Sequence, residues 1–171
     1  MLNKIIKYLI IAGMLTWSVF QYMDGNIGNG IFLNLLTAVP IFLLFRHETN
    51  LLAFWFLRRN KMDRARKILS TVKHPESFPK SQEAYHYFLM GLVESQAGGV
   101  GASEKHFKKA LSTGLRMGHD KALANLNLAG IAMSKRRKRE AINYMNQAKK
   151  LDKAGILDEQ IKMFRKQLGR I

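Results

Sequence analysis

The sequence of 171 residues contains no cysteine, only three prolines and few acidic residues. The absence of cysteine excludes a disulfide-bonded scaffold and a zinc site with cysteine ligands, and it fits a reducing compartment. Lysine and arginine number 28 against 12 aspartates and glutamates, which gives a formal net charge of +16. A charge of this size is typical of chains that meet anionic partners or an anionic surface.

Charged residues are nearly missing from the first 45 positions, which hold only Lys4, Lys7 and Asp24, a net charge of +1. Residues 46–171 hold the other 26 basic and 11 acidic groups, a net charge of +15. The length allows one domain plus an appendage. The basic excess therefore belongs to the domain, and the first 45 residues are the appendage.

Ile5–Met23 is an apolar run whose single charge is Lys7. As a helix it would span about 28 Å, close to the hydrocarbon thickness of a bilayer. Lys7 lies near enough to the end of the run to reach the lipid headgroups. We therefore predict an uncleaved membrane helix. A cleaved signal peptide is the alternative, because lysines precede an apolar core, but no small-x-small cleavage site follows.

Asp24–Gly30 contains three glycines and two asparagines, which predicts a tight turn. Ile31–Phe45 is again uncharged, and it becomes as long as the first run if it is counted from Ile27. Pro40 should bend this helix, a distortion that membranes tolerate. We predict a second span, with a shallow or re-entrant segment as the alternative. Residues 1–45 would then form a transmembrane helical hairpin.

Basic residues flank this hairpin and are absent from its turn. Lys4 and Lys7 precede it, whereas Arg46, Arg58 and Arg59 follow it. By the positive-inside rule, both termini should face the cytoplasm. We therefore expect a two-span protein of a bacterial inner membrane that contacts lipid through residues 1–45.

Residues 46–171 contain a sequence repeat. Similar residues recur at one constant spacing, which leads from Ala53 to Gly91 and again from Gly91 to Ala129. Leu123–Asp152 contains two apolar helical stripes around a basic turn, the pattern of a helix–turn–helix hairpin. A single hairpin cannot bury both of its apolar faces, so recurrence predicts a stack of hairpins. The recurring columns are Leu52, Met90 and Leu128; Ala53, Gly91 and Ala129; Ala65, Ser103 and Ala141; Leu69, Phe107 and Met145; and Val72, Ala110 and Ala148.

At these columns the chain resembles the tetratricopeptide repeat family. That family places a small residue in the first helix of each repeat, followed by alanine, a large apolar residue and alanine in the second. The third unit matches this order with Ala129, Ala141, Met145 and Ala148. The second unit adds Tyr87 at a position where the family prefers tryptophan. The period is four residues longer than the family's 34, and we place the extra residues in the links around Lys73–Glu83 and Leu111–Lys121.

The resemblance implies an all-α fold in which the membrane hairpin is followed by an α-solenoid of about three helix pairs. Ile156–Leu168 is amphipathic and suits the polar-faced helix that closes a repeat array. The predicted segments are the hairpin at 1–45, the cytoplasmic repeat domain at 46–171 with units at 46–83, 84–121 and 122–159, and a cap at 160–171.

Stacked helix pairs of this family form a concave face, and the resemblance implies that this face binds a peptide or a protein surface. The alternative is that many of its residues only pack against neighbouring units. The family's lysine and asparagine clamp for a terminal carboxylate is not supported, because Asn50 and Phe54 stand at two clamp positions and Leu123 stands at another. The groove residues carried over by register are Tyr85, Phe88, Leu92, Leu123, Leu126, Asn127 and Met133.

A dense basic cluster, KRRKR, supports a second function, the binding of a polyanion such as acidic lipid or nucleic acid, including ribosomal RNA. It consists of Lys135, Arg136, Arg137, Lys138 and Arg139. Aromatic residues, which single-strand binders interleave with basic ones, are missing there. Anionic lipid would lie close to a tethered protein, so lipid is the favoured polyanion. The alternative is a solvated turn between helices.

Leu51–Leu57 reads LLAFWFL and is apolar on all sides. It can serve as the first helix of the first repeat, buried by the second repeat. It can also place Phe54 and Trp55 at the membrane interface as part of an aromatic belt. The two interpretations are compatible, since they concern different faces of one helix.

Catalytic signatures are absent from the sequence. Ala97–Ala102 (AGGVGA) has no preceding strand and no GKS or GKT after it, which excludes a phosphate-binding loop. Glu94 should point inward in the repeat register, and we expect it to snorkel or to pair with a lysine rather than act as a general base. The histidines show no metal-binding spacing. We therefore expect no enzymatic activity, no cofactor and no metal, and predict a membrane-anchored interaction scaffold on the cytoplasmic face.

Overall fold

The structure, a computed structural model, describes residues 4–45 and 48–169, and every regular element within these residues is a helix. The predicted all-α fold class is therefore confirmed. The chain divides into two compact units, Met1–Leu51 and Leu52–Ile171. The predicted domain boundary after residue 45 stays a prediction.

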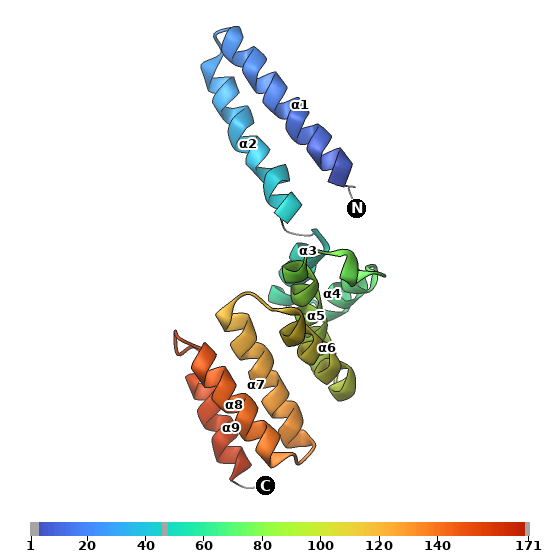
Figure 1. The fold of residues 1–171 in the computed structure, drawn as a ribbon, viewed down its shortest axis with the longest axis vertical. Coiled ribbons are helices and arrows are strands. Elements are labelled where there is room, and N and C mark those ends of the chain that lie inside the picture. The colour runs from blue at the N-terminus through green and yellow to red at the C-terminus, as the bar shows by residue number, and fades with distance from the viewer. Residues whose placement is uncertain (1–3, 46–47, 170–171) are drawn as a thin grey trace. The chain divides into compact units, whose positions relative to one another are not determined.

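The first unit contains two helices, α1 (Lys4–Met23) and α2 (Ile27–Phe45), which lie side by side as an antiparallel pair (Figure 1). Asp24–Asn26 connects them. Gly25 has a φ of 78° there, which glycine adopts without strain. The predicted turn, Asp24–Gly30, is too long, because α2 already begins at Ile27.

The contact between α1 and α2 is partly polar, whereas their outward faces are apolar. The buried Ser18 hydroxyl donates a 3.0 Å hydrogen bond to the Gly30 carbonyl oxygen. A Cβ at Gly30 would lie 2.7 Å from the Tyr22 ring, so the missing side chain permits the close approach. Asn34 Nδ2 donates a 3.0 Å hydrogen bond to the Tyr22 hydroxyl oxygen. The large exposed apolar residues include Ile5, Leu9, Leu15, Trp17, Phe20, Ile31, Phe32, Leu35 and Val39.

Within the described residues, Ile5–Met23 is the one helix that is long and apolar enough to cross a membrane, judged by length and composition. A signal sequence near the N-terminus has the same properties. The apolar part of α2, Ile27–Phe42, is shorter. The two membrane spans therefore stay a prediction.

Lys7, the single charge of the first apolar run, is buried and ion-paired. Its Nζ lies 2.5 Å from Glu48 Oε1, in the first turn of α3 (Glu48–Arg58), and the residue is only 7% exposed. A buried ammonium group needs an anionic partner to compensate for its lost hydration. Lys7 therefore has an anionic partner within the chain, and its contact with lipid headgroups stays a prediction.

The second unit takes in most of α3 and adds a series of helices joined by short turns. α5 packs chiefly against α6, and α7 packs chiefly against α8 (Figure 1). The helices are α4 (Met62–Ser70), α5 (Lys80–Gln96), α6 (Val100–Thr113), α7 (Gly118–Ser134), α8 (Lys138–Leu151) and α9 (Asp158–Leu168), with a 3₁₀ turn, η1 (Pro75–Ser77), between α4 and α5. α5 and α7 each begin four residues before the predicted unit starts at 84 and 122.

The turns within the α3–α4, α5–α6 and α7–α8 pairs have the same backbone geometry. Asn60, Gly98 and Arg136, which are equivalent positions of successive repeats, have positive φ angles of 56°, 79° and 55°. The residue after each donates its N–H to the carbonyl oxygen five residues back, at 2.9, 2.9 and 2.8 Å. A left-handed residue followed by such a bond is a common helix ending. The three turns therefore agree with the repeat register of the sequence.

The repeating columns lie in the core of the second unit. Ser103 donates a 2.9 Å hydrogen bond to the Gly91 carbonyl oxygen, which joins α6 to α5. A Cβ at Gly91 would lie 2.7 Å from the Phe107 ring, so this column needs a small residue to let the helices meet. The exceptions are Val72 and Met90, which are half-buried, and Leu52, which is 51% exposed. The column residues that are at most 1% exposed are Ala53, Ala65, Leu69, Ser103, Phe107, Ala110, Leu128, Ala129, Ala141, Met145 and Ala148.

Candidate functional site

The first helices of successive pairs carry a row of aromatic side chains. The Phe54 and Tyr85 ring centroids are 6.4 Å apart, and those of Tyr85 and Phe88 are 5.9 Å apart. Phe54 is 39% exposed and Tyr85 is half-buried, whereas Phe88 is 3% exposed. The row therefore begins at the surface of α3 and ends in the core at α5.

Three of the seven predicted groove residues are buried. Phe88 belongs to the core formed with Leu89 and Phe107, whereas Leu126 and Met133 are 3% and 7% exposed. Their side chains pack within the chain, which is the alternative that the sequence left open for groove residues. The remaining four, which are half-buried, are Tyr85, Leu92, Leu123 and Asn127.

Helix α9 explains why two of these residues are covered. Leu126 shares a buried cluster with Ile161, and Met133 shares another with Leu168. A Cβ at Gly130 would lie 3.3 Å from the Phe164 ring, so α9 also approaches α7 closely at this point. The helix predicted as a polar-faced cap therefore lies on the part of α7 that the register assigned to the groove.

Asn127 and Leu123 are neighbours on α7. Asn127 Nδ2 donates a 2.8 Å hydrogen bond to the Leu123 carbonyl oxygen, which orients the amide along its own helix. The Leu123 side chain packs against two of the buried clusters while remaining half-buried. Together with Tyr85 and Leu92 on α5, these residues form the accessible part of the predicted groove, which we call the α5–α7 face.

The basic turn between α7 and α8 is exposed along its whole length, and two of its five cations are ion-paired. Lys135 Nζ lies 2.5 Å from Glu104, and Arg137 lies 3.5 Å from both Glu104 and Glu140. Arg136, Lys138 and Arg139 have no side-chain partner among the described residues. Two cations of the turn therefore pair with Glu104 on α6. The other three are available to solvent or to a ligand.

Glu104 is the acidic centre of this network. It accepts hydrogen bonds from Lys108 at 2.6 Å and from Lys135 at 2.5 Å. These two bonds, Lys108 first, lower the pKa of Glu104 to about 2. The carboxylate therefore stays ionised at neutral pH and neutralises part of the basic turn.

Glu94 is buried, as its register predicted, but its partner is an arginine rather than a lysine. Arg66 on α4 lies 2.9 Å from Glu94 Oε1, with the two side chains 53% and 9% exposed. A Cβ at Gly99 would lie 2.8 Å from Glu94 Oε2, so the carboxylate also covers the α5–α6 turn. The pair joins one helix pair to the next, and the expected lysine partner is corrected.

The histidines whose ring contacts the structure gives are packed against aromatic residues. His106 stacks on Tyr87 with the ring centroids 6.1 Å apart, and burial lowers the pKa of His106. His86 contacts Phe78 edge-to-face at 6.1 Å. Among the described residues there is no group of three histidine, aspartate or glutamate side chains that could hold a metal ion.

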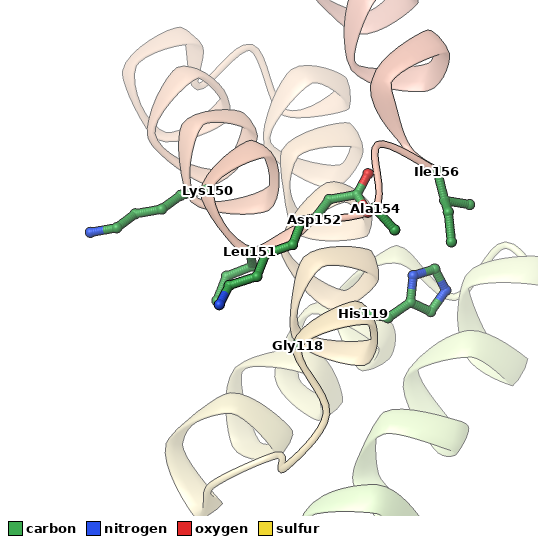
Figure 2. A pocket seen from close by; sticks show the side chains of 8 residues that line it. Gly118, His119, Lys150, Leu151, Asp152, Ala154 and Ile156 are labelled. Carbon is green, nitrogen blue, oxygen red and sulfur yellow. The ribbon is translucent and has the colours of Figure 1, made fainter.

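A shallow cavity of about 380 Å³ lies where α7 begins and α8 ends (Figure 2). Asp152, the one acidic residue of its lining, accepts a 2.6 Å hydrogen bond from the Leu157 N–H through its carboxylate. Lys150 extends away from His119, so the two do not converge on a common point (Figure 2). No pattern in the sequence predicted this cavity, because its lining comes from the start of α7, the end of α8 and the loop that follows α8. The lining residues are Gly118, His119, Lys150, Leu151, Asp152, Lys153, Ala154 and Ile156.

The chain matches no protein-family model, no curated protein and no solved structure in comparisons of all three kinds. The resemblance to tetratricopeptide repeats therefore stays a prediction that depends on the repeated columns. The site must be argued from its own chemistry.

Proposed function

We propose that this protein is a membrane-anchored helical-repeat scaffold that holds a protein or peptide partner at the cytoplasmic face of a bacterial inner membrane. The observation that carries the proposal is the arrangement of the first unit. Ser18 and Thr37 are 1% exposed, whereas Trp17 and Phe32 are each 64% exposed. Water favours the opposite arrangement, in which apolar side chains are buried, while a lipid environment favours this one.

The contacts of α1 with α2 support a permanent hairpin over a cleaved signal peptide. Ser18 and Tyr22 on α1 are hydrogen-bonded to Gly30 and Asn34 on α2. Cleavage after α1 would leave the Gly30 and Asn34 groups without these partners. With 19 residues, α2 would reach about 28 Å, enough for a second span.

The equivalent turns at Asn60, Gly98 and Arg136 support an α-solenoid of three tetratricopeptide-like helix pairs, closed by α9. Such arrays present their first helices to partners. The partner-binding surface that we propose is the α5–α7 face, which consists of Tyr85, Leu92, Leu123 and Asn127. Its apolar and amide groups suit a peptide better than a polyanion.

The second candidate function, polyanion binding through the basic turn, is favoured by one observation. Arg136, Lys138 and Arg139 are exposed and not ion-paired within the described chain. The pairing of Lys135 and Arg137 with Glu104 weakens it, because it gives the turn a role in joining helix pairs.

The membrane part of the proposal is tested by reporter fusions after Ile171. A reporter that is active only in the cytoplasm should work at this position, and one that is active only in the periplasm should not. Strong periplasmic activity would contradict the topology.

The binding part is tested by capturing partners from solubilised membranes with the full chain at low and high salt. Tyr85→Ala with Asn127→Ala should abolish capture of a salt-resistant partner, because apolar contact is not screened by ions as exposed charges are. Replacing Arg136, Lys138 and Arg139 with glutamine should leave that partner bound. A matched control replaces Lys149, Lys150 and Lys166, which removes the same charge elsewhere. Loss of every partner with the basic-turn variant alone would instead establish the polyanion function.

A further inference from the structure

The solvent-facing side of α3 has an unusual composition for the surface of a repeat domain. Leu52 and Trp55 are 51% and 45% exposed, and Arg58 and Arg59, which follow them on the helix, are exposed as well. Ala53, on the opposite side of the helix, is fully buried. We call the exposed residues Leu52, Trp55, Arg58 and Arg59 the α3 face.

Aromatic rings and guanidinium groups lie in contact on this helix. Arg59 Cζ lies 4.1 Å from the centre of the Trp55 ring, and Arg58 Cζ lies 6.0 Å from that of Phe54. Elsewhere in residues 48–169 the large exposed apolar side chains are aliphatic and scattered, at Val100, Met117, Ile142, Ile156 and Met163. Exposed aromatic side chains within this range are therefore confined to α3.

We propose that the α3 face docks on the anionic surface of the same membrane that α1 and α2 enter, and binds phospholipid headgroups there. The inference rests on the proposed membrane hairpin. Only residues 46 and 47 separate the end of α2 at Phe45 from the start of α3 at Glu48, so chain connectivity alone keeps α3 near the lipid headgroups.

The chemistry of the face fits this occupant better than a protein. Tryptophan prefers the membrane–water interface, because its ring is apolar and its N–H needs a polar partner. Residues 52–73 hold seven basic groups and one acidic group, a net charge of +6 that complements an anionic leaflet. A basic residue near such a surface contributes about a fivefold change in the binding equilibrium. The docked α3 would hold the repeat array at a defined orientation to the bilayer.

The two tryptophans of the chain provide a direct test. Trp17→Phe leaves Trp55 as the only indole in the full-length protein, reconstituted in vesicles of phosphatidylcholine with phosphatidylglycerol. We expect Trp55 to be quenched by lipids that are brominated near the headgroup, and to be protected from aqueous acrylamide. In vesicles of phosphatidylcholine alone, or in high salt, that protection should fall. A Trp55 that remains open to acrylamide and is not quenched by lipid in anionic vesicles would overturn the proposal.

The reciprocal variant separates this inference from the proposal on which it rests. Trp55→Phe leaves Trp17, which should be quenched by lipids that are brominated deep in the acyl chains. Quenching of Trp17 without quenching of Trp55 would overturn only the docking of α3. Absence of quenching at Trp17 would overturn the membrane hairpin itself.

Arginine substitutions test the role of charge in the Trp17→Phe protein. Arg58→Gln with Arg59→Gln should lower the equilibrium constant for docking about fivefold per arginine, measured by the loss of headgroup-bromine quenching in anionic vesicles. Lys149→Gln with Lys166→Gln removes the same charge from the exposed surfaces of α8 and α9 and should leave the quenching unchanged. Equal losses with both variants, or protection of Trp55 that depends on protein density rather than on lipid charge, would overturn the assignment of this face to lipid.

Discussion

Arg66 on α4 lies 2.9 Å from the Glu94 carboxylate on α5, and Glu104, the equivalent of Arg66 in the next repeat, lies 2.5 Å from Lys135 at the end of α7. The same column of the repeat thus connects each helix pair to the next, with the signs of the charges exchanged. At the third occurrence the column holds Ile142, which is 41% exposed. The charge pattern that joins the pairs therefore ends at the last of the three pairs.

The Arg66–Glu94 pair should contribute measurably to stability. Arg66→Gln leaves the Glu94 carboxylate buried without its cation, and we expect a loss of about 1–2 kcal/mol in the free energy of unfolding. The measurement is thermal unfolding of the detergent-solubilised protein followed by circular dichroism. Arg139→Gln, at an exposed position without an ion pair, is the control. In the double variant Arg66→Gln, Glu94→Gln, part of the loss should be recovered. Equal stability of the Arg66 variant and the control would show that the pair contributes nothing.

The Glu104 network predicts an acid-sensitive part of the stability. The pKa of Glu104 is lowered from 4.5 to about 2 in the folded protein, by Lys108 first and then Lys135. A carboxyl group whose pKa is lowered on folding stabilises the protein above its unfolded pKa. That contribution is lost as the pH falls from 4.5 towards 2. The partners are half-exposed, so we expect about 1–2 kcal/mol, less than the pKa change alone would give.

The corresponding experiment compares the melting temperature of Glu104→Gln with that of the unchanged protein across this pH range. The variant should be less stable at neutral pH, and the difference should disappear near pH 2. Glu159→Gln is the control, because the Glu159 side chain is 84% exposed. A difference between Glu104→Gln and the unchanged protein that stays constant with pH would rule out the ionised network as its cause.

Two glycines of the second unit should respond to alanine in opposite directions. A Cβ at Gly91 would lie 2.7 Å from the Phe107 ring in the core, and Gly91→Ala should cost about 1–3 kcal/mol by overpacking. A Cβ at Gly101, in helix α6, meets nothing within 4 Å. Gly101→Ala should therefore stabilise the protein by about 0.4–1 kcal/mol, since alanine restricts the unfolded chain more. Chemical unfolding of both variants checks the sign, and two changes of the same sign would contradict the packing at Gly91.

The columns at Ala129 and Ala148 allow a similar comparison with a surface site. Both residues are fully buried, and Ala129→Leu or Ala148→Leu should cost about 1–3 kcal/mol by crowding the α7–α8 contact. Ala102 is exposed on α6. Ala102→Leu therefore makes the same chemical change at a position where the larger side chain extends into solvent, and it should cost little stability. If the stabilities of the three variants are equal, the proposed register is wrong.

The helical period could be recognised in the sequence because it is a local property. Small residues at Ala53, Gly91 and Ala129 recur at one spacing, and each marks a place where two neighbouring helices must approach. Neighbours in sequence are here neighbours in space, so the all-α class, the short turns and most of the core columns follow from the pattern. The same local logic placed Glu94 inward correctly.

Contacts between distant segments were decided only by the tertiary structure. Leu126 and Met133 occupy groove positions by register, yet α9 covers them with Ile161 and Leu168. The sequence could not show where α9 would pack, because an amphipathic helix specifies that it will bury one face but not against which surface.

For the charged residues, too, the sequence determined some properties and the tertiary structure determined others. The sequence alone determined that the chain is strongly basic and that its basic groups lie outside the first 45 residues. It did not determine that Lys7 pairs with Glu48, that Glu94 pairs with Arg66, or that Glu104 takes up two cations of the basic turn. Ion pairing depends on distances of a few ångströms between side chains that lie far apart in sequence, and only the packing of the helices sets those distances.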